Sequence, residues 1–304
     1  MTIYDLKTMQ ICDITCNTIV ALGTFDGCHE GHRAIFGQAI RSAIKHKVKS
    51  AVFTFAEPPS ISSKRAIYTL DEKISFIRKT GIDYLVVENF DAIHNLSGEE
   101  FFDSVLVSKL HAVGAVCGYN YRFGKNALCS AENLNDFFKK VGGSVDICPE
   151  ITYLDRTVSS SRIRAEIENG NVESILPYSD PYTVYAIVEH GKKLGRSMGT
   201  PTINQHIPEI KVSPKRGVYI TECEIGEDVY PSITNVGSRP TTDGDSAPEN
   251  IETHIIGFDG DLYSSYIRVN FYKRLRDEKK FSSLEELTKQ IANDCAAAKD
   301  YFLK

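Results

Sequence analysis

Two histidines in a glycine-bearing turn are the first residues in this 304-residue chain whose types and spacing could do chemistry. His29 and His32 are three positions apart at the start of an expected helix, so both imidazoles can face one point in space. Gly31 between them leaves room for a ligand to approach the backbone closely. The alternative is that they are incidental surface residues, as nearby histidines commonly are.

The elements around the histidines favour a phosphate site. Residues 18–22 (TIVAL) are β-branched and apolar, which predicts a buried parallel strand. Gly23 and Gly27 then bracket a turn, and apolar residues at a spacing of four after His32 predict a helix. A strand, turn and helix in this order place backbone N–H groups and the helix dipole against an anionic ligand.

A second anion site is indicated by residues 158–164 (VSSSRIR) at the start of another expected helix. Serine hydroxyls and free N–H groups at a helix start, with the Arg162 guanidinium beside Ser161, suit a triphosphate. The alternative interpretation is that one serine is merely the N-cap.

Oxygen ligands for a metal follow a glycine-rich segment, residues 191–204 (GKKLGRSMGTPTIN). Pro201 forces an extended start, in which Thr202 and Asn204 share one side of the chain. A hydroxyl and an amide oxygen suit Mg²⁺, which takes hard oxygen ligands and keeps several waters. Taken alone, Pro-Thr-x-Asn is a weak signal.

The first part of the chain must hold these groups in a Rossmann-like parallel sheet. Strands are expected at 50–55, 84–88 and 113–117, and helices at 71–79 and 97–110. Strands that alternate with helices indicate βαβ units, whose ligands lie at the carboxyl ends of the strands. We expect this α/β domain to occupy residues 1–176.

After residue 176 the helical periodicity stops, and short extended runs at 182–189, 217–225, 251–258 and 266–271 alternate with turns. These runs predict a small antiparallel β-barrel over residues 177–304. Residues 282–285 (SSLE) form an expected capping box for a last amphipathic helix that covers the barrel.

The composition and net charge of the chain bear on which classes of partner it can bind. A net charge of −5 argues against broad electrostatic capture of nucleic acid, and 42% hydrophobic residues are typical of a globular protein. The eight cysteines show no CxxC pair, and no apolar run has the length of a signal peptide or a membrane span. The sequence therefore predicts a cytoplasmic protein with no nucleic-acid or membrane partner.

Residues 23–32 (GTFDGCHEGH) resemble the HxGH signature of the nucleotidylyltransferases. In the fuller form G-x-F-D-G-x-H-x-G-H they resemble the bacterial bifunctional riboflavin kinase/FMN adenylyltransferases, or FAD synthetases. The resemblance implies that His29 and His32 are catalytic and hold phosphate oxygens. It also implies nucleotide contacts at Gly23, Phe25, Asp26, Gly31, Ser161 and Arg162.

Two further segments of the first domain bear on the resemblance. Residues 118–124 (GYNYRFG) resemble the family's G-x-D-F-x-F-G loop, which implies flavin contacts at Asn120, Arg122 and Phe123. Asn120 stands where the family usually has Asp, so it keeps the hydrogen-bonding geometry but loses the charge. Residues 57–59 (EPP) replace the Pro-His-Pro that the family often carries.

The glycine-rich segment resembles the riboflavin kinase motif G-x-x-x-G-R-x-x-G-F-P-T-A-N, with Thr200 and Ile203 in place of Phe and Ala. The resemblance implies Mg²⁺ ligands at Thr202 and Asn204. Residues 251–254 (IETH) resemble the strand that carries the catalytic glutamate, which would be Glu252. The implied nucleotide and flavin contacts are Gly191, Gly195, Arg196 and Gly199, and Arg276 and Glu278, respectively.

The resemblance thus implies a Mg²⁺-dependent enzyme that makes FMN from riboflavin and ATP in its C-terminal domain. It makes FAD from FMN and ATP in its N-terminal domain. Three alternatives stay open: a protein with one activity, most plausibly the kinase; a non-catalytic flavin or nucleotide-binding regulator; and an enzyme that adenylylates another substrate.

Overall fold

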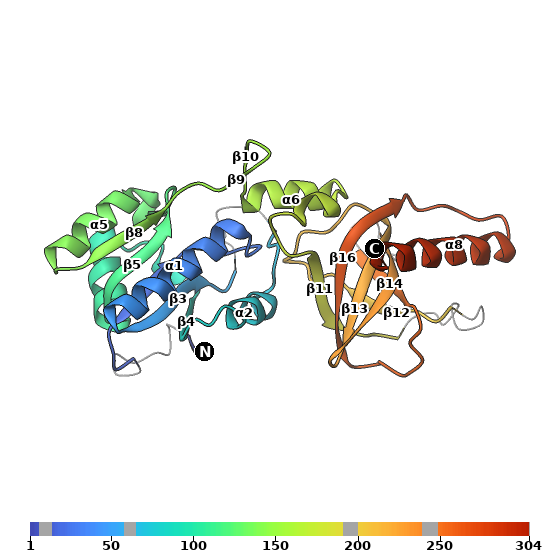
Figure 1. Cartoon of the computed structure of the whole chain (residues 1–304), viewed down its shortest axis with the longest axis horizontal. Coiled ribbons are helices and arrows are strands. Elements are labelled where there is room, and N and C mark those ends of the chain that lie inside the picture. The colour runs from blue at the N-terminus through green and yellow to red at the C-terminus, as the bar shows by residue number, and fades with distance from the viewer. Residues whose placement is uncertain (6–13, 58–64, 191–199, 239–248, 304) are drawn as a thin grey trace. The chain divides into compact units, whose positions relative to one another are not determined.

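The computed structural model describes residues 1–5, 14–57, 65–190, 200–238 and 249–303, drawn in Figure 1. The chain divides into two compact units, Met1–Ser160 and Ser161–Lys304. This division lies sixteen residues before the expected boundary at 176, because residues 172–175 contact the strand Tyr266–Arg276, and the Lys215 amide donates to the Ile167 carbonyl at 3.4 Å. Among the described residues, no helix combines the length and the apolar character that crossing a membrane requires.

The first unit contains a six-stranded sheet in which every pairing is parallel, as expected. The order is β1-β4-β3-β2-β5-β8. Strands β1 and β8 form the two edges, and neither was indicated by the sequence pattern. The bounds are β1 (Thr2–Asp5), β2 (Thr18–Leu22), β3 (Lys49–Phe55), β4 (Tyr84–Glu88), β5 (Ala112–Gly118) and β8 (Ser144–Cys148).

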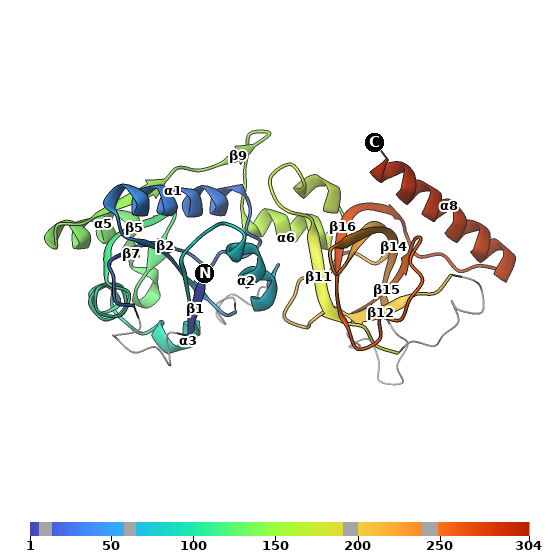
Figure 2. The same ribbon diagram turned by 60° about the horizontal axis from the view of Figure 1, so that its bottom comes forward.

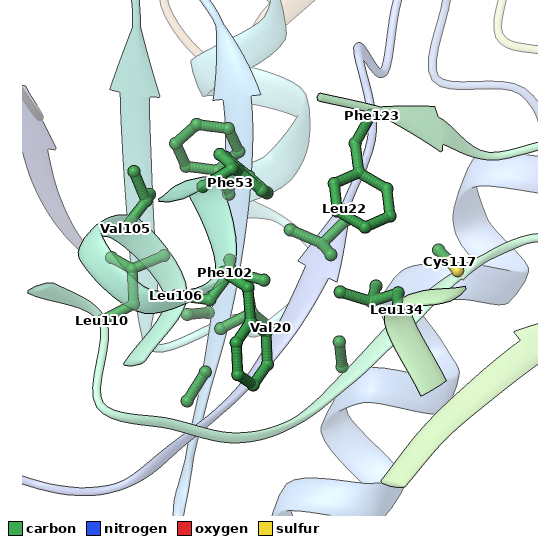
Figure 3. Packing of buried hydrophobic residues seen from close by; sticks show 14 of the residues in the cluster. Val20, Leu22, Phe53, Phe102, Val105, Leu106, Leu110, Cys117, Phe123 and Leu134 are labelled. Atoms are coloured by element: carbon green, nitrogen blue, oxygen red, sulfur yellow. The ribbon is translucent and has the colours of Figure 1, made fainter. Parts of the chain in front are cut away.

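Helices cover both faces of this sheet. Helices α1 (Glu30–His46) and α2 (Leu70–Arg78) share one core cluster, which includes Phe36 and Ile77. On the other face, a π-helix over Phe101–Lys109 and α5 (Ala131–Lys140) pack on the sheet, as Figure 3 shows for Phe102 and Leu134. Successive residues of β2 alternate between the two clusters, because side chains in a strand alternate in direction.

Shorter elements complete the first unit. The expected capping box at Ser97 and Glu100 is confirmed, and it opens the short α4 ahead of the π-helix. The remaining bounds are α3 (Phe90–Ile93), α4 (Gly98–Glu100), β6 (Arg122–Phe123), a 3₁₀ turn (Lys125–Ala127), β7 (Cys129–Ser130), β9 (Thr152–Tyr153) and β10 (Arg156–Thr157).

The order of strands reverses direction beside β2. After β2 the chain adds β3 and β4 on one side, and then β5 and β8 on the other. Ala21 of β2 pairs with Val116 of β5, so the turns that follow these two strands leave the sheet side by side. Open parallel sheets bind ligands at this kind of switch point.

The second unit is the expected antiparallel barrel, in the order β11-β16-β13-β14-β15-β12. The Glu189 amide donates a 2.8 Å hydrogen bond to the Asn204 carbonyl, which links the two ends of the sheet. Figure 2 shows the strands curling around a common interior. The bounds are β11 (Tyr182–Ile187), β12 (Ile203–His206), β13 (Gly217–Ile225), β14 (Asp228–Ser238), β15 (Glu249–Ile255) and β16 (Tyr266–Arg276).

Helices flank the barrel as well. The last helix, α8 (Leu284–Phe302), packs Ala298 and Phe302 against Ile220 and Ile233 of the barrel, as its apolar stripe predicted. Its N-cap is Ser283, whose side chain accepts from the Glu286 amide, so the cap is one residue later than the sequence suggested. The unit also contains α6 (Ser160–Glu168), apart from its first residue, and a 3₁₀ turn (Val172–Ile175).

Candidate active sites

The two histidines lie together at the start of α1. His29 is the N-cap residue, and its ring stacks on that of His32 with 3.8 Å between centroids and 21° between planes. The His29 side chain makes no capping hydrogen bond, so it does not occupy the N–H groups at this helix start. The N–H groups at the start of this helix therefore remain available to bind an anion at the switch point of the sheet.

Burial keeps both imidazoles neutral near neutral pH. Burial lowers the pKa of His29 to about 4, although the nearby Asp26 carboxylate opposes the shift. The pKa of His32 also lies well below its usual range, because of burial first and then the charges of His29 and Lys73. The Nδ1 atom of each ring is buried without a hydrogen-bond partner in the described residues. These two atoms retain hydrogen-bonding capacity for a bound ligand.

Small and aromatic residues shape the turn that carries the histidines. Phe25 is wholly buried, and its ring meets His32 edge-on at 5.3 Å. A Cβ atom on Gly31 would lie 3.1 Å from the His29 ring, and one on Gly23 would lie 2.8 Å from the Phe25 ring. Gly31 and Gly23 therefore make room for the rings on which the site depends. Direct nucleotide contact by Gly23, Phe25 and Gly31 stays a prediction.

Asp26 and Ser160 anchor the same turn. The Asp26 carboxylate accepts hydrogen bonds from the amides of Ile67 (2.9 Å) and Tyr68 (3.1 Å), which binds the turn to the segment before α2. The Ser160 hydroxyl donates to the Asp26 carbonyl at 2.6 Å. Sequence reasoning selected Ser161 and missed Ser160, whose signal was its place in the serine run. A phosphate contact by Asp26 stays a prediction.

The predicted flavin residues of the loop after β5 have different surroundings. Asn120 and Arg122 are exposed on the loop that leaves the sheet beside the histidine turn. Phe123 is only 7% exposed and packs on Phe101 at 5.9 Å, in the core shown in Figure 3. The Phe123 ring thus anchors the loop, and flavin contact by these three residues remains a prediction.

Arg162 stacks within the second unit, where its guanidinium lies 4.7 Å from the centre of the Tyr178 ring. This cation–π contact fixes the orientation of the side chain at the start of α6. Phosphate contact by Ser161 and Arg162 stays a prediction.

Polar side chains cross three strands of the barrel in one row. Glu252 on β15 pairs with Asn204 on β12 and with Asn235 on β14. Directly paired residues point to the same face of a sheet, so these side chains are neighbours. The Asn235 amide also donates to a Glu278 carboxylate oxygen at 3.1 Å. The row therefore connects the candidate base Glu252 with the candidate metal ligand Asn204 and, through Asn235, with Glu278.

The donor set at Asn204 fits a magnesium ion. Asn204 is only 6% exposed, and the neighbouring Asn250 has a buried Oδ1 atom without a hydrogen-bond partner among the described residues. Thr202 directly precedes β12 and is partly buried. These are the hard, uncharged oxygens that Mg²⁺ accepts beside water and phosphate. The described part of the chain contains no group of three or more His, Cys, Asp and Glu side chains that could hold a metal.

Arg276 has a structural partner. Its guanidinium binds the Asp294 carboxylate of α8 with N–O distances of 3.2 and 2.8 Å. Flavin contact by Arg276 and Glu278 stays a prediction.

Some residues named in the sequence analysis lie outside the described part of the chain. They are Gly191, Gly195, Arg196 and Gly199, together with Pro58 and Pro59.

Two family models match the chain, one in each half. A model described as FAD synthetase matches residues 12–162, and a model described as riboflavin kinase matches residues 178–302. The two matches are consecutive and fall largely within the first and second structural units, respectively.

Curated relatives span nearly the whole chain. A Bacillus subtilis protein named bifunctional riboflavin kinase/FMN adenylyltransferase is 33% identical, covering 94% of this chain and 92% of its own length. A Listeria monocytogenes protein of the same name is 31% identical and covers 99% of this chain and 97% of its own length. An Escherichia coli protein of that name is also 31% identical and covers 93% of this chain and 92% of its own length.

A solved structure confirms the fold. A chain from Streptococcus pneumoniae, described as a macrolide-efflux protein, matches with a TM-score of 0.86 at 28% identity, over 98% of this chain and 99% of that one. Its description differs from the names of the curated relatives, and the similarity concerns the fold. From the two family models and the full-length relatives, we conclude that this chain belongs to the family of bifunctional riboflavin kinase/FMN adenylyltransferases.

Proposed function

We propose that this chain carries both activities of its family, with FMN adenylyltransferase in the first unit and riboflavin kinase in the second. The observation that carries the proposal is the placement of the two family matches, because each covers a unit with its own polar site. In the first unit this site is the stacked histidine pair, and in the second it is the Asn204–Glu252–Asn235 row.

In the first reaction, an FMN phosphate oxygen attacks the α-phosphorus of ATP. The bond between the α-phosphorus and the bridging oxygen breaks, and pyrophosphate leaves with that oxygen. Such a transfer needs alignment and charge stabilisation more than a nucleophilic side chain. His29, His32 and the N-terminus of α1 supply hydrogen bonds and a dipole for the phosphate oxygens. The family resemblance further implies that Arg162 neutralises charge on the leaving pyrophosphate, and this role stays a prediction.

In the second reaction, the riboflavin 5′-hydroxyl attacks the γ-phosphorus of ATP. Glu252 takes the hydroxyl proton, the bond to the bridging oxygen breaks, and ADP leaves. Glu252 is suited to this role because its side chain is exposed while its strand is fixed by pairing on both sides. Thr202 and Asn204 would hold Mg²⁺, which neutralises phosphate charge when bound.

The proposed function also specifies where the protein acts and which ligands it binds. We infer that ATP, riboflavin, FMN and FAD bind to the protein in the cytoplasm, with no nucleic acid or membrane as partner. The net charge of −5 supports the exclusion of nucleic acid.

One chromatographic assay tests both activities. The protein is incubated with ATP, Mg²⁺ and either riboflavin or FMN, and the three flavins are separated over time. His32→Ala is expected to lower FAD formation about 100-fold, the usual loss for one well-placed donor, and to leave FMN formation unchanged. Glu252→Ala should stop FMN formation and leave the conversion of supplied FMN to FAD unchanged.

Matched controls separate these effects from general damage. His46→Ala changes an exposed histidine at the other end of α1, and Glu227→Ala changes an exposed glutamate in a turn of the barrel. Both controls should behave as the unaltered protein. FMN formation without FAD formation would favour a kinase with one activity, and flavin binding without ATP turnover would favour a non-catalytic regulator.

A further inference from the structure

A buried lysine outside the family signatures contacts the histidine turn. Lys73 lies on α2, and only 3% of its surface is exposed. Its Nζ atom donates to the Thr24 carbonyl at 3.0 Å and to the Phe55 carbonyl at 2.8 Å. Thr24 belongs to the turn that carries the histidines, and Phe55 is the last residue of β3. Lys73 therefore ties the turn to the carboxyl end of the neighbouring strand.

This attachment lies directly before a residue with a strained backbone conformation. Phe25 directly follows Thr24 and has a φ of 47°, a conformation that side chains other than glycine adopt at a cost. The Thr54 hydroxyl also donates to the Thr24 carbonyl, at 3.0 Å. Two donors thus fix the carbonyl that precedes the strained residue, and the Phe25 ring beyond it supports His32.

Burying an ammonium group in this interior costs free energy, because the charge loses its hydration. A purely structural contact would not need that charge. Burial lowers the pKa of Lys73, and the Asp26 carboxyl and Cys28 thiol of the turn oppose that shift. The ammonium charge in turn lowers the pKa of His32, together with burial and the charge of His29. A neutral side chain could make the same hydrogen bonds but would not act on His32.

We propose that Lys73 is a positioning residue of the adenylyl-transfer site, which fixes the histidine turn to the end of β3 and so holds the stacked rings of His29 and His32 in place before phosphate binds. The proposal rests on the function proposed above. An uncharged His32 avoids repulsion from the nearby ammonium, and an incoming phosphate can then accept hydrogen bonds from an already ordered ring pair.

The test compares Lys73→Met with Lys79→Met, which makes the same chemical change at an exposed residue directly after α2. The ionisation of His32 is followed by NMR of the imidazole nitrogens in the free protein, and the signal is assigned with a His32→Gln sample. Lys73→Met should move the protonation midpoint of His32 to higher pH, and Lys79→Met should leave it in place. The groups that face the Lys73–His32 pair from the turn are Asp26, Cys28 and His29.

Activity gives a second readout within the same chain. Lys73→Met should lower kcat for FAD formation about 100-fold, the scale expected for a misplaced site, while FMN formation stays within about twofold. Where Lys73→Met does not fold, Lys73→Gln replaces it, because its amide can still donate to a carbonyl without carrying charge. Lys73→Gln should show the same shift of the His32 midpoint.

The outcomes are distinguishable. An unchanged His32 midpoint in the folded neutral variant overturns the proposal even where FAD formation falls, because lost activity alone is what a purely structural lysine would give. A shifted midpoint with unchanged FAD formation also overturns it. Unaltered protein that makes no FAD overturns the proposed adenylyltransferase function itself, and with it the role of Lys73 in that reaction.

Discussion

At the scale of single residues, the histidine pair combines stacking with burial. The rings of His29 and His32 lie 3.8 Å apart, and a proton on one would repel a proton on the other. The free protein therefore holds two neutral imidazoles, each with a buried nitrogen that lacks a partner among the described residues. Buried polar groups of this kind lower stability unless a ligand satisfies them, which is typical of a binding site.

The lowered pKa of His29 predicts acid sensitivity of the fold. The folded state holds this pKa at about 4, whereas an unfolded histidine titrates near the usual value of 6.5. As the pH falls between these values, the unfolded state binds the proton first, so the free energy of unfolding falls. At a pH of about 5 the contribution of His29 to this loss is about 2 kcal/mol.

Urea unfolding of the unaltered protein and of His29→Gln, at a pH of about 7.5 and about 5, measures this effect. Because glutamine cannot take a proton, the variant should lose about 2 kcal/mol less between the two conditions. Equal losses in the two proteins would show that His29 titrates normally in the folded state.

Among the secondary-structure elements, helix α1 contains two glycines at which a substitution by alanine should have different effects. A Cβ atom on Gly31 would press on the His29 ring at 3.1 Å, whereas one on Gly37 would meet the mobile end of the Arg41 side chain at 3.3 Å. Gly31→Ala should therefore displace the ring pair and lower FAD formation about 10-fold to 100-fold. Gly37→Ala, the matched control, should leave activity unchanged and raise the free energy of unfolding by about 0.5 to 1 kcal/mol.

The chromatographic assay and urea unfolding of both variants measure these outcomes. Equal FAD formation by the two variants would mean that the ring placement does not depend on the space at Gly31.

Helix α8 is fixed to the barrel by a buried ion pair as well as by its apolar stripe. Asp294 is 4% exposed and binds the Arg276 guanidinium with two oxygens. Asp294→Ala should lower the free energy of unfolding by about 3 kcal/mol, because it leaves a partly buried guanidinium without its carboxylate.

Asp300→Ala on the exposed face of the same helix is the control for urea unfolding. Equal stability of the two variants would mean that the Arg276–Asp294 pair contributes nothing to docking of the helix.

At the scale of the whole molecule, two sites on separate units predict complementation between damaged proteins. His32→Ala should still make FMN from riboflavin, and Glu252→Ala should still make FAD from FMN. A mixture of the two variants should therefore convert riboflavin to FAD much faster than either variant does alone, because FMN released by the first can bind to the second.

Chromatography of the mixture and of each variant by itself measures this outcome, and a mixture of the two control variants, His46→Ala and Glu227→Ala, gives the full rate. A mixture that accumulates FMN without FAD would show that the two sites cannot exchange FMN between molecules.

Elements whose patterns are local could be predicted from the amino-acid residues alone. The buried strand before the histidines, the helix after them and the cap at Ser97 were all predicted, because strand alternation, helical periodicity and capping depend on residues a few positions apart. The assignment of two activities likewise came from contiguous motifs. The placement of the histidine pair three positions apart at a helix start was also visible in this way.

The distant residues that support those motifs became visible only in the folded chain. The pairing of Glu252 with Asn204 and Asn235 depends on strand register, and β12 is four residues long, too short for its own pattern to predict it. Lys73 lies 49 positions from the Thr24 carbonyl that it binds. Contacts of this kind arise when packing brings separate segments together to bury apolar surface, and no local pattern encodes the pairing of segments that far apart.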